Sequence, residues 1–171
     1  RNFICTMGMG AAALAPFYII SVYIISLTAQ LNLPSSQSML LNVGVFLMWM
    51  IFIPIIGYFS DKIGLAKMMS CGAILLMVVS IPVFSFVSHD VSLGKILLGQ
   101  TILSFCGAFF VAPMGAFLAT KAFPAFSRYS GMALGISCGE AIFGGTAPLV
   151  ATALVVLTGA SIAPGFYLMF C

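Results

Sequence analysis

Apolar residues occur along this chain in long stretches that short polar segments separate. Each full stretch holds at least about 20 residues, the number that an α-helix needs to cross the hydrocarbon core of a bilayer. The pattern predicts five complete helices and the start of a sixth, at residues 3–29, 39–60, 68–87, 96–120, 130–158 and 165–171. We therefore predict an all-α bundle of transmembrane helices. Because the chain begins at Arg1 and stops within an apolar stretch, we expect a fragment of a longer protein.

The composition agrees with a membrane protein and excludes a water-soluble domain. Apolar residues make up 63% of the chain and charged residues 5%, whereas soluble domains carry about 25% charged residues. Three acidic and six basic side chains cannot cover the surface of a globular protein of 171 residues. The five cysteines are scattered without a Cys-x-x-Cys pair, so we expect neither a disulfide nor a metal site.

The basic residues are distributed unequally between alternate polar segments. Positive residues are enriched in cytoplasmic loops. One set of segments carries all but one of them, namely Arg1, Lys62, Lys67, Lys121 and Arg128, and the other set carries Lys95. We therefore expect the Arg1 end and the segments after the second and fourth helices to be cytoplasmic. The segments around Pro34, His89 and Ala163 are expected to face outward.

Proline and glycine lie inside the predicted helices. A proline removes a helical hydrogen bond, which neighbouring helices or water must replace in a membrane. The residues concerned are Pro16, Pro54, Pro82, Pro113 and Pro148, with Gly131, Gly135 and Gly139 spaced by four on the fifth helix. Such glycines allow another helix to approach closely. The pattern favours helices that bend and move against each other, and ordinary bundle packing is the alternative.

The second helix ends on a charged turn, 61–67, and the charged segment 57–67 comprises this turn and the last residues of the helix. Gly57 is expected to allow a tight helix contact and Gly64 to adopt a positive φ. Asp61 can accept from a helix N-terminus or pair with a base, while Lys62 and Lys67 hold the segment in the cytoplasm. The order of these residues resembles the cytoplasmic loop signature of the major facilitator superfamily, except that Leu65 and Ala66 replace its further basic residues.

A second set of segments resembles the metabolite:proton symporter family within that superfamily. These segments are Ala122-Phe123-Pro124, Arg128-Tyr129-Ser130-Gly131 and Ile142–Pro148, with Phe17-Tyr18, Tyr23 and Tyr167-Leu168 elsewhere. The resemblance covers nearly the whole chain. It implies a C-terminal half-domain over residues 1–171, with helices seven to eleven and the start of the twelfth. It also implies an N-terminal half that supplies the rest of the transport cavity.

Glu140 is the ionisable residue that lies well inside a predicted helix. Acidic residues within membranes are costly and commonly functional. We predict that it binds a proton or a cationic part of the solute, and a protonated glutamic acid hydrogen-bonded between helices is the alternative. Tyr18, Tyr23, Asn42 and Gln100 are weaker candidates, for which a bond between helices is the alternative. Arg128 is a candidate for a cytoplasmic gate.

The residues favour secondary transport over other functions. The resemblance implies proton symport of a small organic solute, such as an osmolyte or a carboxylate, by alternating access across a bacterial inner membrane. An exporter or a uniporter, a receptor without transport activity and a channel are the alternatives. An embedded enzyme would need a constellation of catalytic residues, which the sequence lacks, and no phosphate-binding loop is present. We expect no cofactor and no nucleic-acid partner.

Overall fold

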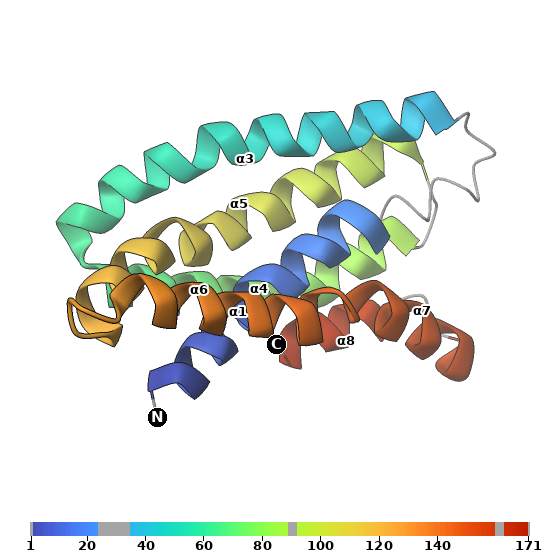
Figure 1. Ribbon diagram of the computed structural model, residues 1–171. Coiled ribbons are helices and arrows are strands. Elements are labelled where there is room, and N and C mark those ends of the chain that lie inside the picture. The colour runs from blue at the N-terminus through green and yellow to red at the C-terminus, as the bar shows by residue number, and fades with distance from the viewer. Residues whose placement is uncertain (1, 24–34, 89–91, 160–162, 171) are drawn as a thin grey trace.

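The computed structural model describes residues 2–23, 35–88, 92–159 and 163–170, which form a bundle of helices without strands (Figure 1). The elements in chain order are α1 (Asn2–Tyr18), η1 (Ile19–Tyr23), α3 (Ser35–Ile63), α4 (Leu65–Ser88), α5 (Leu93–Phe117), η3 (Leu118–Ala122), α6 (Arg128–Gly139), η4 (Glu140–Gly144), α7 (Ala147–Thr158) and α8 (Ala163–Phe170). The elements marked η are π-helical. Five helical segments are long and apolar enough to cross a membrane. The predicted all-α transmembrane bundle is confirmed.

Several predicted helix ends are wrong. The segment 61–67, predicted as a charged turn, is helical except at Gly64, which separates the end of α3 at Ile63 from the start of α4 at Leu65. The predicted fifth helix divides into α6, η4 and α7. The last helix begins at Ala163, before the predicted start at residue 165. Residues 24–29 of the first predicted helix lie outside the described residues.

Helix α5 lies at the centre of the bundle and packs against α3 and α4, while α1 packs against α6 (Figure 1). Ile96 and Leu103 on α5 are completely buried, and Phe84 on α4 is 2% exposed. Trp49 on α3 belongs to the same core. The outer face of α3 is apolar and open, with Met50 74% exposed. An exposed surface of this kind suits lipid or another part of a membrane protein, because neither requires polar groups.

Three of the five prolines within the predicted helices lie close to π-helical segments. Pro16 precedes η1, Pro113 precedes η3 and Pro148 follows η4. Pro54 and Pro82 instead lie within the continuous helices α3 and α4. A π-helical turn interrupts the regular hydrogen bonds of an α-helix and occurs often at functional sites. The chain is irregular here, since Gly145 N donates to Glu140 O at 2.8 Å in place of a regular α-helical bond.

Glycines bring α1 and α6 into close contact. A Cβ atom at Gly135 would lie 2.7 Å from Thr6 Cγ2, and one at Gly139 would overlap the carbonyl oxygen of Met7. Both neighbours are on α1, so the predicted close approach of another helix is confirmed at these two positions. The same expectation is wrong at Gly131, which faces the ring of Phe123 in the segment before α6.

Candidate functional site

Tyr18 and Glu140 meet where α1 crosses the start of η4. The Tyr18 hydroxyl donates to Glu140 Oε1 at 3.0 Å, although the two residues are 122 positions apart. Both side chains are partly buried. The structure therefore joins the predicted intramembrane acid to one of the predicted tyrosines.

Two glycines of the α6–η4 helix make this contact possible. Gly139 lets α1 approach next to Glu140, as described above. Gly144, one turn further along, lies under the ring of Tyr18, because a Cβ there would be 3.0 Å from Tyr18 Cδ2. The Phe17 ring also contacts the Tyr18 ring edge to face, with centroids 5.8 Å apart. The tyrosine is thus positioned by the helix that carries its hydrogen-bond partner.

The helix beyond Glu140 offers further polar groups. Pro148 lies at the start of α7 and has no N–H to donate to the carbonyl of Gly144. Thr146 Oγ1 donates to the Ile142 carbonyl oxygen within the same bend. Interrupted helices in transporters expose backbone groups of this kind at binding sites. Among the described residues, the partner of Glu140 is a phenol and not a cation, so its carboxyl group remains available to a proton or a cationic group.

The other predicted site residues lie apart from this pair. Gln100 is completely buried, and its Nε2 donates to the Ile20 carbonyl oxygen at 3.1 Å, which makes it a link between α5 and η1. Asn42 is on α3, with Oδ1 buried and unpartnered. Arg128 begins α6, and its Nε is likewise unpartnered among the described residues. The side chain of Tyr23 lies outside the described part of the chain.

The charged segment between α3 and α4 is only partly as predicted. Gly64 has φ +111°, which confirms the expected positive value. A Cβ at Gly57 would meet no atom within 4 Å, so the expected tight contact is wrong for the part of the chain that the structure describes. Asp61 likewise makes no hydrogen bond or ion pair there. Lys62 Nζ instead lies 4.3 Å from the centre of the Tyr58 ring, in a cation–π contact.

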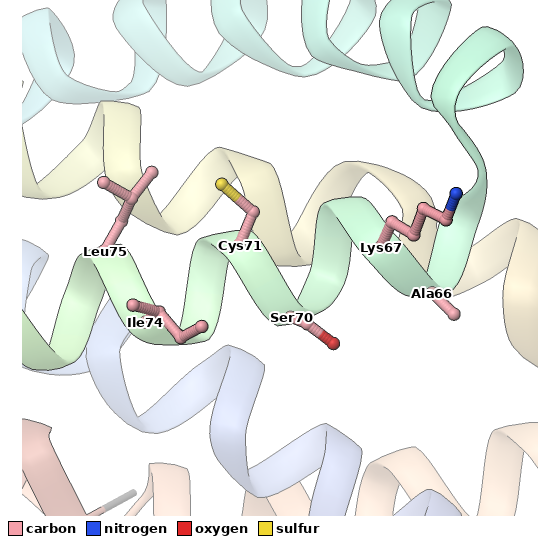
Figure 2. A pocket seen from close by; sticks show the side chains of 6 residues that line it. All are labelled: Ala66, Lys67, Ser70, Cys71, Ile74 and Leu75. Carbon is pink, nitrogen blue, oxygen red and sulfur yellow. The ribbon is translucent and has the colours of Figure 1, made fainter.

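A shallow groove of about 560 Å³ lies on the outer surface of α4, and it includes Lys67 of the charged segment. Figure 2 shows Lys67, Cys71 and Leu75 projecting to one side of α4 and Ser70 to the other. All the residues that line it belong to this single helix, and it includes neither Tyr18 nor Glu140. We therefore place the candidate site at the Tyr18–Glu140 pair and not in this groove.

Sequence reasoning named both members of this pair and Gly139, but it missed Gly10 on α1 and, elsewhere in the bundle, Ser104. Gly10 faces the backbone of Ile136 at 3.1 Å from a built Cβ and completes the close crossing of α1 and α6. Its signal in the sequence is weak, because glycine is common in membrane helices. Ser104 is completely buried with an unpartnered hydroxyl, and a lone serine in an apolar helix carries no signal of that kind.

Comparison with known proteins identifies relatives of this chain by sequence. No family model and no solved structure matches the chain. The chain is 25% identical to the ectoine/proline transporter ProP of Corynebacterium glutamicum over 171 residues, which cover 99% of the chain and 34% of that protein. It is 32% identical to the citrate-proton symporter of Salmonella typhi over 154 residues (90% of the chain, 35% of that protein) and 29% identical to that of Klebsiella pneumoniae over 168 residues (98% and 38%).

The names of these relatives describe what the chain resembles. One is named as a transporter and two as symporters. The five helices suited to cross a membrane support an integral membrane protein. The chain spans about a third of the length of these relatives.

Proposed function

We propose that this chain is part of a proton-coupled secondary transporter of the major facilitator superfamily, within the metabolite:proton symporter family. It would form the C-terminal half and line one side of a central cavity. The observation that carries the proposal is the Tyr18–Glu140 hydrogen bond beside an interrupted helix. Similarity over nearly the whole chain to a proline/ectoine carrier and to citrate-proton symporters supports it.

Protonation of Glu140 would couple the transport of the solute to the movement of a proton. As a carboxylate, Glu140 accepts the hydrogen bond from Tyr18 and can hold a cationic group of the solute. As a neutral acid, it loses its charge and gains a donor, and it can move through an apolar environment at lower cost. Alternating access is largely a rocking of one half of a carrier against the other around a site between them. Tyr18 and Glu140 both belong to the proposed C-terminal half, and we propose that the pair lies on the side of this half that faces the other half.

Uptake by the intact protein tests the proposal. The full-length protein would be reconstituted in proteoliposomes with an inward proton gradient and supplied with labelled proline, ectoine or citrate. We expect at least one of them to accumulate above its external concentration and a protonophore to abolish the accumulation. Equilibration that does not respond to the gradient would indicate a uniporter, and binding without uptake would indicate a receptor. Either result would contradict proton symport.

We also propose a bacterial inner-membrane location with the Arg1 end in the cytoplasm. The connection between α3 and α4, flanked by Lys62 and Lys67, lies at the same end of the bundle as the connection between η3 and α6, flanked by Lys121 and Arg128 (Figure 1). The start of α5, whose first turn contains Lys95, lies at the opposite end. The charge difference between the two ends supports this orientation.

Cysteine labelling tests this orientation. Phe126, in the connection before α6, is 92% exposed, and Thr158 ends α7 on the other side. In a cysteine-free version of the full-length protein, we expect a membrane-impermeant maleimide to label Thr158→Cys in intact cells. Phe126→Cys should react only after the membrane is opened. The reverse pattern would invert the proposed orientation.

A further inference from the structure

Buried polar atoms without a hydrogen-bond partner lie on the two helices α3 and α5, which pack against each other, and one of these residues also contacts η1. Five side-chain atoms in the described residues are buried without a hydrogen-bond partner. One is Arg128 Nε, and the others are Asn42 Oδ1, Trp49 Nε1, Gln100 Oε1 and Ser104 Oγ. We call these last four residues the α3–α5 polar seam. Native proteins leave few such atoms unsatisfied, so their concentration in one region needs a physical account.

The spacing of these residues places them on facing surfaces. Asn42 and Trp49 are seven residues apart on α3, and Gln100 and Ser104 are four apart on α5, so each pair shares one helix face. Gln100 contacts η1 through its bond to the Ile20 carbonyl oxygen. The Trp49 ring lies against Gly107, with ring atom Cη2 3.2 Å from a built Cβ. Because Gly107 is one turn beyond Ser104 on the same face, the seam continues from η1 to Trp49.

The hydroxyl of Ser104 differs from the other hydroxyls of these helices. A serine or threonine inside a helix commonly donates to a carbonyl one turn earlier. Thr101 on α5 donates to Leu97 O at 2.8 Å, and Ser21 on η1 donates to Phe17 O at 2.6 Å. Ser104 has no such bond, although it is completely buried. Its donor and acceptor therefore both remain available to a ligand in the seam.

We propose that the α3–α5 polar seam binds one or more ordered water molecules. Gln100 Oε1 and Asn42 Oδ1 accept, Trp49 Nε1 donates, and Ser104 Oγ does both. This mixture suits water, which also donates and accepts, and buried water commonly makes about three bonds to such groups. A cation would be opposed by the indole N–H, and an anion by the two amide oxygens. A bridging water contributes nearly as much as a direct hydrogen bond.

The direction in which Ser104→Ala changes the melting temperature tests the proposal. If Ser104 bonds to water, Ser104→Ala removes a satisfied hydrogen bond, and the melting temperature of the full-length protein should fall by about 2–4 °C. If the hydroxyl has no partner, its removal relieves an unsatisfied buried group and the melting temperature should rise. Thr101→Val is the control, because that hydroxyl already bonds within α5 and is not buried; we expect a shift below about 1 °C.

A high-resolution structure of the full-length protein in lipid nanodiscs provides the second measurement. We expect ordered water within about 3.2 Å of Ser104 Oγ and Gln100 Oε1. A higher melting temperature for Ser104→Ala, or a seam without density, would overturn the proposal. A site whose density and melting temperature depend on sodium rather than choline would also overturn it, because the ligand would then be a cation.

Discussion

Glu140→Gln is expected to remove proton-driven accumulation of the solute by the full-length protein. Glutamine keeps the size of the side chain, and its Oε1 can still accept from the Tyr18 hydroxyl, but it cannot bind and release a proton. Accumulation in proteoliposomes should therefore fall by about tenfold under a gradient of one pH unit if one proton moves with each solute, because that gradient supplies about 1.4 kcal/mol, which corresponds to a tenfold concentration ratio. Uptake should also lose its dependence on external pH. Initial rates across a series of imposed pH gradients measure both effects.

Tyr18→Phe tests the role of the hydrogen bond separately from that of the carboxyl group, because it removes the hydroxyl and leaves Glu140 in place. The phenylalanine ring can still lie on Gly144, so the packing described above is retained. We expect weaker solute binding with pH dependence retained, because the proton site remains. Tyr129→Phe is the matched control, since Tyr129 on α6 is 80% exposed. Unchanged pH dependence and affinity in Glu140→Gln, at equal amounts of folded protein, would leave Glu140 with a structural role only.

Gly139→Leu should prevent α1 from packing against α6. Even a single added carbon would overlap the Met7 carbonyl oxygen and lie 3.0 Å from Ala11 N. These are backbone atoms, so a rotamer change of a neighbour cannot relieve the overlap. Overpacking of this kind costs about 1–3 kcal/mol and sometimes more. We expect Gly139→Ala to lower the melting temperature and Gly139→Leu to abolish folded, monodisperse protein, both measured by size-exclusion chromatography after heating in detergent.

Gly8 on α1 provides the comparison. A Cβ there would meet no atom within 4 Å among the described residues, and alanine is favoured over glycine within helices by about 1 kcal/mol. Gly8→Ala should therefore leave the melting temperature unchanged or raise it. If Gly139→Ala behaves in the same way, the close α1–α6 crossing is not a feature of the folded protein.

Hydropathy predicted the helices because the membrane imposes a simple requirement on length and polarity. It could not predict where α3 ends, since the residues around Gly64 continue the helix despite their charge, and a single positive φ makes the break. The same limit applies to Gly57. Its place in a signature suggested a contact, but the described chain holds no atom near it.

The candidate site could be predicted from the sequence only in part, for a different reason. An acid within an apolar helix identified Glu140, because burial of charge is costly and rarely accidental. The choice between Tyr18 and the other polar residues depended on how α1 and α6 are rotated about their axes. That rotation follows from the close contacts at Gly135 and Gly139, which no local pattern in α1 could reveal.

The π-helical segments also affect how this chain should be compared with relatives. An α-helix advances about 100° per residue, and a π-turn holds one residue more than an α-turn. The wider π-turn also turns less per residue, so it absorbs its extra residue locally. Loss of one residue from η4 would therefore restore a regular helix and leave the residues of α7 on nearly the same face. Single-residue gaps in alignments should therefore be expected near 19–23, 118–122 and 140–144, and they would mark the gain or loss of a π-turn rather than errors.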